Sequence, residues 1–110
     1  MSKKIRTIIV DDTPTAITKL EHDLKFFSDI EVIECISSPK AAIKSIIKQQ
    51  PDLIFLDIEM PGMTGLELLY QINDDVTKMR VFFYTSHNQY LIYAVRTSAF
   101  YYLHKPYLPE

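Results

Sequence analysis

The length, composition and charge of the chain define one small globular domain over residues 1–110. Hydrophobic residues make up 47% of it and charged residues 24%, which excludes an intrinsically disordered chain. Twelve basic and fourteen acidic side chains give a formal charge of −2, so no overall attraction to nucleic acid or an anionic membrane is expected. A single cysteine excludes an internal disulfide framework, and no apolar run approaches the ~18 residues that span a bilayer. We therefore expect a cytoplasmic domain that binds neither membrane nor, directly, nucleic acid.

The first strand–helix unit begins with an apolar, β-branched run at Ile5–Val10, which predicts a strand. Pro14 suits the first turn of a helix, with Asp12 or Thr13 as its N-cap. Apolar residues then recur at steps of three and four, which places them on one helical face. This inward face is expected to contain Ile17, Leu20, Leu24 and Phe27.

The second unit repeats this pattern. Val32–Ile36 predicts a strand. Ser38 and Pro39 favour the start of a helix, and Pro51 cannot continue it. The inward face of this helix is expected to contain Ile43, Ile46 and Ile47.

The rest of the chain predicts three more strands and two more helices. The run Leu53–Leu56 has no polar alternation, which is typical of a parallel strand covered on both faces. Thr64 and Glu67 have the spacing of a capping box at the start of a helix. The remaining elements are, in chain order, a strand at Val81–Tyr84, a helix from near Asn88 with Leu91, Ala94 and Val95 inward, and a strand at Ala99–Leu103.

Strands therefore alternate with helices four times before a fifth strand. This alternation predicts an α/β fold with a doubly wound parallel sheet and right-handed crossovers. In such sheets ligands bind at the carboxyl ends of the strands. The polar residues that follow the expected strands are Asp11 and Asp12, Asp57, Thr85 and Ser86, and Lys105. We expect these carboxylates, hydroxyls and the ammonium group to gather along one edge of the sheet.

Three carboxylates at one edge would repel one another, and a divalent cation removes that repulsion. Mg²⁺ prefers oxygen ligands and needs only one or two protein carboxylates. With Lys105, it suits phosphoryl transfer, because both cations stabilise charge on the transferring group. Asp57 follows a buried central strand and is the best candidate for the nucleophile, which leaves Asp11 and Asp12 to hold the metal.

Each of these signals also has a purely structural explanation. Asp12 and Thr85 could cap helices, and Asp57 could belong to an acidic turn. Lys105 could be a solvated charge at the sheet edge. Four such signals at four strand ends nevertheless favour a shared site over separate caps.

Taken together, the motifs resemble a response-regulator receiver domain, from Lys4 to Pro106. The motifs are Asp11–Asp12, Asp57–Leu68, Thr85–Ser86 and Tyr102–Pro106. The resemblance implies a flavodoxin-like fold, a five-stranded parallel sheet with strand order 2-1-3-4-5. It also implies that the domain is no enzyme toward a separate substrate and catalyses only its own phosphorylation and dephosphorylation.

The resemblance assigns a role to each acid and to the lysine. Asp57 matches the residue that accepts a phosphoryl group from the phosphohistidine of a sensor histidine kinase. Asp12 and Asp57 match direct Mg²⁺ ligands, with the backbone carbonyl of Glu59 as a third. Asp11 matches an acid that acts on the metal largely through water. Lys105 matches the lysine that contacts the phosphoryl oxygens.

The resemblance also implies a switch. The hydroxyl of Thr85 and the backbone N–H of Ser86 match the groups that bind the new phosphoryl oxygens, while Tyr102 turns inward. The surface of the fourth helix and fifth strand would then change and control an output domain, expected C-terminally and DNA-binding. A homodimer through that same surface is one arrangement the resemblance allows.

Two local features concern the parent protein. Only four residues follow Pro106, so the fifth helix of the family is missing or truncated, and we expect a fragment of a longer regulator. The segments Tyr84–Tyr90 and Ala99–Leu103 most resemble receivers joined to LytTR-type DNA-binding domains. The parent would then regulate transcription.

Two other functions remain as alternatives. A Mg²⁺-dependent phosphohydrolase could use Asp57 as its nucleophile and Glu59 as its general acid, but the short chain has no insertion to form a substrate cap. A degenerate receiver could serve only as a binding module, but all five key side chains of the family are present.

Overall fold

The computed structural model of the chain describes residues 4–57, 59–72, 79–85 and 101–104. Its strands are β1 (Ile5–Val10), β2 (Ile30–Ile36), β3 (Leu53–Leu56), β4 (Arg80–Thr85) and β5 (Tyr101–His104), and its helices are α1 (Pro14–Leu24), α2 (Pro39–Gln49) and α3 (Gly65–Ile72). All paired strands are parallel, in the order β2-β1-β3-β4-β5. The parallel α/β sheet and the order 2-1-3-4 are therefore confirmed. The expected fourth and fifth helices, and the start of the last strand at Ala99, lie outside the described residues.

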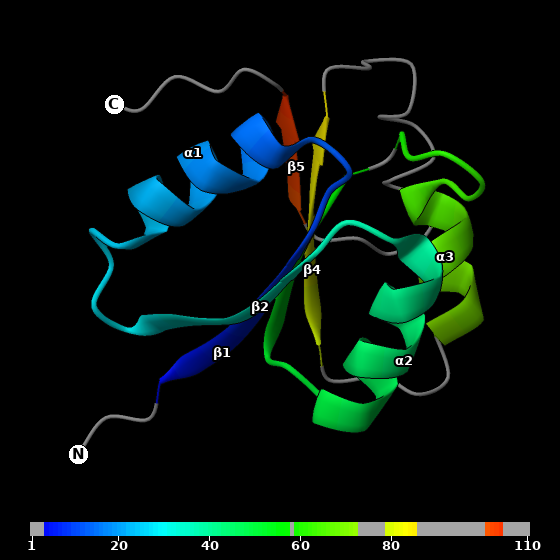
Figure 1. Cartoon of the computed structure of the whole chain (residues 1–110). Helices are drawn as coiled ribbons and strands as arrows, with labels where there is room; N and C mark the ends of the chain where they lie inside the picture. The colour runs from blue at the N-terminus through cyan, green and yellow to red at the C-terminus, as the bar shows by residue number, and fades with distance from the viewer. Residues whose placement is uncertain (1–3, 58, 73–78, 86–100, 105–110) are drawn as a thin grey trace.

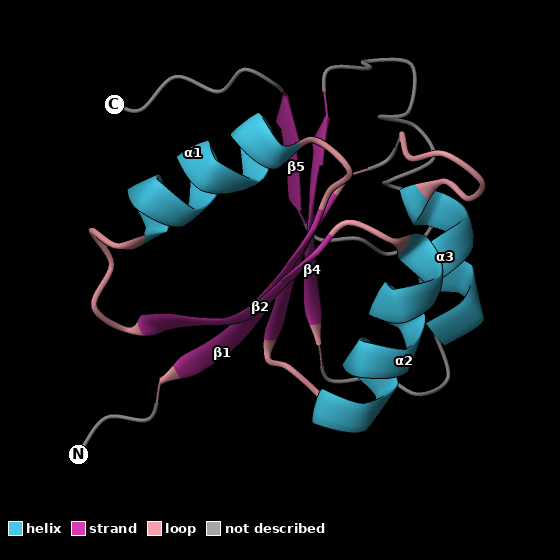
Figure 2. Cartoon of the chain, viewed as in Figure 1, coloured by secondary structure: helices cyan, strands magenta, loops and turns pink. Residues whose placement is uncertain are grey.

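The sheet lies between two layers of helix, with α1 on one face and α2 and α3 on the other (Figures 1 and 2). The alternation of side chains along β1 explains this arrangement. Ile8 and Val10 are buried in a cluster with residues of α2 and α3, whereas Ile9 is buried against Leu20 of α1. Neighbouring apolar residues in one strand thus serve two different cores.

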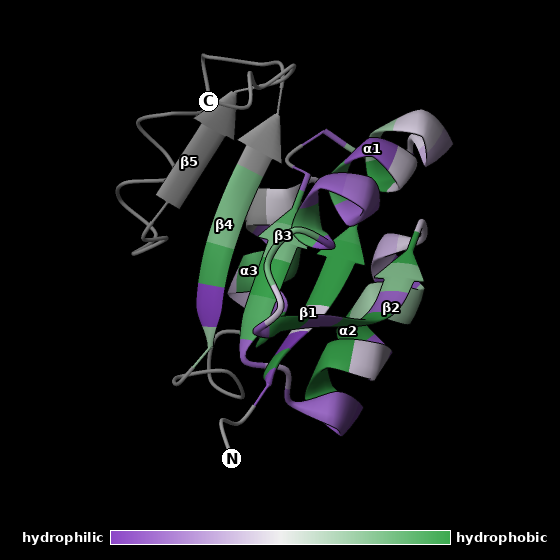
Figure 3. Cartoon of the chain, turned by 90° about the vertical axis from the view of Figure 1, so that its left-hand side faces the viewer, coloured by the Kyte–Doolittle hydropathy of each residue, from purple (hydrophilic) through white to green (hydrophobic). Residues whose placement is uncertain are grey.

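The hydrophobic strands β1 and β3 run through the middle of the molecule, and polar segments lie at their ends (Figure 3). This pattern matches strands that are covered on both faces. None of the helices in the described part of the chain is long and apolar enough to cross a membrane. Polar groups beside the central strands are thus found mainly at the two ends of the sheet.

Two predicted core residues are exposed instead. Phe27 is 59% exposed because α1 ends at Leu24, and its backbone N–H donates to the Leu24 carbonyl in the turn that follows. Ile47 is 40% exposed because α2 buries the row that contains Ala42 and Ile46, and the next residue is rotated by about 100° away from that row. Both predictions were wrong, the first about where a helix ends and the second about the width of its buried face.

The edge strand β2 is longer than predicted and irregular. It begins at Ile30 and pairs with β1 as far as Ile36. The register shifts between Thr7 and Ile8, which oppose Val32 and Glu34, so that β2 carries one extra residue, Ile33. Such bulges are common at sheet edges, where they twist the strand and discourage pairing with other chains.

Candidate metal and phosphorylation site

Two of the predicted acids directly follow the paired central strands β1 and β3. Val10 and Leu56 are register partners, so Asp11 and Asp57 leave the sheet side by side. The backbone N–H of Asp57 donates to the Val10 carbonyl at 2.9 Å, and that of Asp11 donates to the Ile36 carbonyl at 3.0 Å. The sheet hydrogen bonding thus continues through both acids and fixes their backbone.

Asp11, Asp12 and Asp57 form one cluster, as the strand-end pattern predicts. Each offers a carboxylate oxygen, and these oxygens all lie within 4.8 Å of one another. Asp11 is completely buried and Asp57 is 4% exposed, whereas Asp12 is half-buried. Three carboxylates so close together repel one another unless a cation balances their charge. All-oxygen donors, partly open to solvent, are the chemistry that Mg²⁺ favours, so these residues fit that ion.

Backbone N–H groups hold two of the carboxylates in place. Oδ1 of Asp11 accepts a hydrogen bond from the N–H of Thr13 at 2.8 Å, and Oδ1 of Asp57 accepts one from the N–H of Glu59 at 3.4 Å. Each acid is therefore oriented by a residue two positions later.

The start of α1 differs from the prediction in one detail. Thr13 is the N-cap residue, but its side chain makes no capping hydrogen bond. The carboxylate of Asp11, and not that of Asp12, accepts the backbone hydrogen bond at this turn. An aspartate two residues before the N-cap of a helix that begins with proline is the signal that could have identified this bond. Asp12 is consequently available to the cluster.

The loop after β3 carries Glu59, whose side chain is exposed. Met60 is buried in the core, and Gly62 adopts a φ of +84°, a conformation that residues with a side chain rarely adopt. The predicted capping box then begins α3: the Thr64 N–H donates to Glu67 and the Glu67 N–H donates to the Thr64 hydroxyl, both at 3.1 Å. The loop between Asp57 and α3 is thus held at both of its ends.

The remaining predicted site residues belong to later parts of the chain. Thr85 ends β4, which pairs with β3, and Tyr102 lies in β5, but the structure does not describe their side chains. Ser86 and Lys105 lie outside the described residues. The roles expected for these four residues stay predictions.

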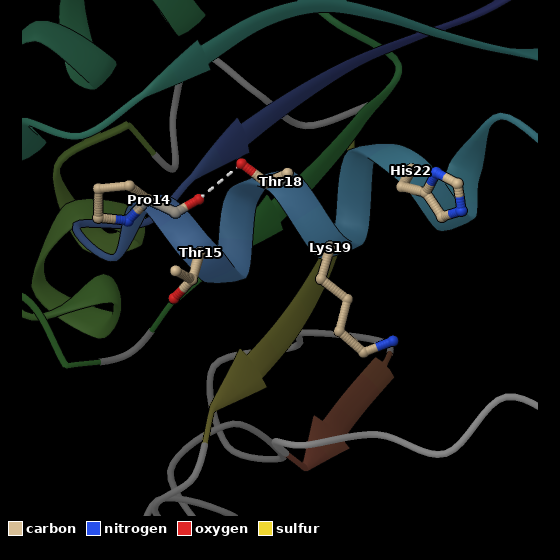
Figure 4. A pocket seen from close by; sticks show the side chains of 5 residues that line it. All are labelled: Pro14, Thr15, Thr18, Lys19 and His22. Atoms are coloured by element: carbon tan, nitrogen blue, oxygen red, sulfur yellow. Dashed lines mark hydrogen bonds between the residues drawn. The ribbon is translucent and has the colours of Figure 1, made fainter.

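A shallow open hollow of about 450 Å³ lies along α1, apart from the acid cluster. It is lined by Pro14, Thr15, Thr18, Lys19 and His22 (Figure 4). The Thr18 hydroxyl donates to the Pro14 carbonyl at 3.0 Å, so the hydrogen bond of this hydroxyl stays within α1. None of the described residues that line the hollow is a predicted site residue.

Comparison with known proteins identifies the family. The model of the response regulator receiver domain matches residues 7–110, and the chain belongs to this family. An uncharacterized response regulatory protein of Vibrio vulnificus is 40% identical over 106 residues, which cover 96% of this chain and 43% of the relative. The transcriptional regulatory protein BtsR of Escherichia coli is 38% identical over 102 residues, which cover 93% of this chain and 42% of BtsR. The chain thus spans less than half the length of these relatives.

A solved structure gives the same result. The response regulator domain of Thermotoga maritima CheB superimposes with a TM-score of 0.83 at 29% identity, covering 94% of this chain and 80% of that one. The chain is therefore the receiver domain of a two-component response regulator. Receivers typically bind Mg²⁺ at an acidic cluster, and Asp11, Asp12 and Asp57 form such a cluster here.

Proposed function

We propose that the chain accepts a phosphoryl group on Asp57 from the phosphohistidine of a sensor histidine kinase. The observation that carries this proposal is the buried carboxylate of Asp57 at the end of β3, within 4.8 Å of oxygens of Asp11 and Asp12. Asp12, Asp57 and the Glu59 carbonyl would hold Mg²⁺ directly, with Asp11 acting largely through water. When bound, the ion would balance the three carboxylates and stabilise charge on the transferring group.

The transfer itself needs little from the protein beyond position and charge. A carboxylate oxygen of Asp57 forms a bond to phosphorus while the bond from phosphorus to the histidine nitrogen breaks. The electron pair of that bond returns to the imidazole, so no oxidant or reductant is required. The N–H of Glu59 donates to Oδ1 of Asp57 and so helps to orient the carboxylate for attack on phosphorus.

The new phosphoryl group would act as a switch. It adds negative charge and acceptor oxygens. Thr85, the N–H of Ser86 and Lys105 would bind them, and Tyr102 would turn inward as Thr85 moves. The altered surface of the fourth helix and fifth strand would then signal to the output domain.

The same proposal covers the parent protein. We infer a longer cytoplasmic regulator of which residues 1–110 are the receiver, with a C-terminal DNA-binding output domain of the LytTR type. BtsR, named as a transcriptional regulatory protein, supports a transcriptional output. A homodimer through the fourth helix and fifth strand would couple phosphorylation to that output.

The test uses acetyl phosphate as donor. With Mg²⁺, intact-mass spectrometry should show one phosphoryl adduct on the chain and none on Asp57→Asn. Asp52→Asn is the matched control. Asp52 is an exposed aspartate directly before β3, whereas Asp57 comes directly after it. An adduct that persists in Asp57→Asn, or one that forms equally without divalent cation, contradicts the proposal.

Glu59 favours one second candidate, a Mg²⁺-dependent phosphohydrolase. Its exposed side chain lies two residues after Asp57, where such an enzyme needs a general acid. Repeated turnover of p-nitrophenyl phosphate that is lost in both Asp57→Asn and Glu59→Gln would establish it. A single adduct without turnover establishes the receiver function instead.

A further inference from the structure

Helix α2 carries three lysines on its outer side. Lys40, Lys44 and Lys48 are all exposed and follow one another at four-residue steps. Each step advances about 6 Å along the helix and turns only about 40° around it, so the three ammonium groups form one stripe. In the described part of the chain, the ion pair Lys19–Asp23 lies on α1, and no ion pair involves the stripe.

The stripe opposes the stability of the helix that carries it. Lysines four residues apart repel each other, and this happens twice along α2. Lys40 also lies in the first turn, where the helix dipole favours acidic residues, whereas Lys48 in the last turn suits the dipole. Helix α2 contains no acidic residue to relieve these charges, although the whole chain has a net charge of −2. A local pattern that reduces stability without a compensating contact is typical of a surface selected for binding.

The helix presents these lysines on a fixed frame. Ala42 and Ile46 anchor its inner side and are completely buried. At its start the Ser38 hydroxyl accepts a hydrogen bond from the Ala41 N–H, and at its end the Arg6 guanidinium donates to the Gln49 carbonyl. The spacing of the lysines is therefore set before any partner arrives, which reduces the entropic cost of binding.

Within the described residues, one acidic side chain of β2 is already hydrogen-bonded to side chains of α2. Glu34 of β2 accepts hydrogen bonds from the Ser45 hydroxyl and from the Gln49 side-chain amide. The amide of Gln49 also donates to the hydroxyl of Ser45. The flank of α2 that faces β2 is thus satisfied internally, and the stripe remains for an external partner.

An exposed apolar residue decides between two kinds of partner. Ile47 of α2 lies between Lys44 and Lys48 in the sequence and is 40% exposed. Ala41, next to Lys40, is also exposed. An apolar side chain finds no partner on a phosphate backbone, whereas the acidic face of a protein helix can offer one. The mixture of lysines and an isoleucine favours an acidic protein surface.

We propose that the outer face of α2 (Lys40, Ala41, Lys44, Ile47 and Lys48) docks an acidic amphipathic helix of a partner protein. Its carboxylates would lie at four-residue steps, opposite the lysines, with one apolar residue against Ile47. This face lies on the side of the sheet away from α1 (Figure 1). It uses no residue of the acid cluster, so it does not depend on the proposed phosphorylation.

The test measures binding of a fluorescent helical peptide that carries three glutamates at four-residue steps and one leucine beside them. Fluorescence anisotropy should show saturable binding to the chain and none with glutamine in place of glutamate. K40Q/K44Q/K48Q should weaken binding roughly tenfold, because exposed ion pairs each contribute little. The matched control K4Q/K19Q/K25Q changes net charge equally and should bind as the unchanged chain does. Absence of binding, equal weakening by both triple variants, or binding of duplex DNA in place of the peptide overturns the proposal.

A second variant separates docking from simple solvation. K44E converts both lysine–lysine pairs of α2 into lysine–glutamate pairs, so it should raise the melting temperature of the free chain. The same change should abolish peptide binding. If K44E raises the melting temperature but the peptide still binds, the lysines of α2 do not hold the peptide, and this outcome contradicts docking. Acetyl phosphate should still phosphorylate K44E, so failure here is distinguishable from failure of the proposed function.

Discussion

The two ends of the parallel sheet handle charge in opposite ways. At the amino end, the backbone of Arg6 hydrogen-bonds to Asp52, while the Arg6 guanidinium donates to backbone carbonyls at the end of α2. At the carboxyl end, Asp11, Asp12 and Asp57 bring like charges within 4.8 Å. Both ends are built from the same central strands, so the difference reflects the side chains and not the fold.

The amino end is organised for stability. The Arg6 N–H donates to the Asp52 carboxylate at 2.9 Å, and the Asp52 N–H donates back to the Arg6 carbonyl at 2.8 Å. The Arg6 guanidinium donates to the carbonyls of Gln49 and Gln50 at 2.8 and 3.1 Å, where α2 ends. Helix-end carbonyls that lack an internal partner are thereby satisfied.

The carboxyl end is organised for binding. Asp11 and Asp57 are held by the sheet and by backbone N–H groups, which limits how far these two acids can move apart to relieve their repulsion. A preformed cluster of this kind lowers the cost of capturing a cation and lowers the stability of the cation-free chain. The comparison thus predicts that a bound metal or the loss of one carboxylate raises stability at the carboxyl end, whereas the loss of Arg6 lowers it at the amino end.

The largest expected effect is stabilisation by Mg²⁺. At a concentration 100 times the dissociation constant, the ion should raise the free energy of unfolding by about 2.7 kcal/mol, because it binds the folded chain alone. Asp12→Ala should remove most of this gain, whereas Asp52→Asn should keep it. Chemical denaturation with and without Mg²⁺ measures both. Equal gains in the two variants would place the cation elsewhere.

Neutralising the cluster should stabilise the chain when no divalent cation is present. Asp57→Asn keeps the size of the side chain and removes one of three like charges, so unfolding should cost about 2 kcal/mol more in EDTA. The N–H of Glu59 can still donate to the amide oxygen that replaces Oδ1. A decrease in stability, measured by urea denaturation, would show that the carboxylates do not oppose one another.

The comparison also shows what sequence can and cannot predict. Strand-end position predicted that Asp11, Asp12 and Asp57 gather, because parallel strands end at one edge. The capping box of Thr64 and Glu67 was predicted because it depends only on local spacing. Ile47 was predicted wrongly, since periodicity gives the centre of a buried face but not its width. The network of Arg6 escaped prediction because its partners lie more than 40 residues away and are mostly backbone atoms.

The amino end should respond to loss of its arginine. Arg6→Met keeps the aliphatic stem and removes the guanidinium, which leaves the last carbonyls of α2 without this donor. We expect a loss of about 1.5 kcal/mol, because Arg6 is only half-buried and water replaces part of the interaction. Lys4→Met is the control for a charge lost from the same end. Mg²⁺ affinity should not change in either variant, and a loss of affinity in Arg6→Met would couple the two ends.

The smallest expected effect concerns Cys35, near the end of β2. Burial raises the pKa of its thiol above the usual value, and the carboxylates of Glu21 and Glu34 raise it further. The folded chain therefore holds the thiol proton more tightly than the unfolded chain does. The stability that this provides is complete below about pH 8.5 and is lost as the pH rises through the pKa of the folded thiol.

The pKa of the Cys35 thiol is thus sensitive to the negative charge of Glu21 and Glu34. Iodoacetamide should alkylate the folded chain more slowly at pH 8.5 than the urea-unfolded chain. Glu21→Gln should lower the thiol pKa and speed alkylation modestly, because burial is the larger cause and remains. Cys35→Ser should flatten the fall in stability above pH 8.5. If Glu21→Gln instead slows alkylation at every pH, access and not charge controls the thiol, and the negative field does not extend to β2.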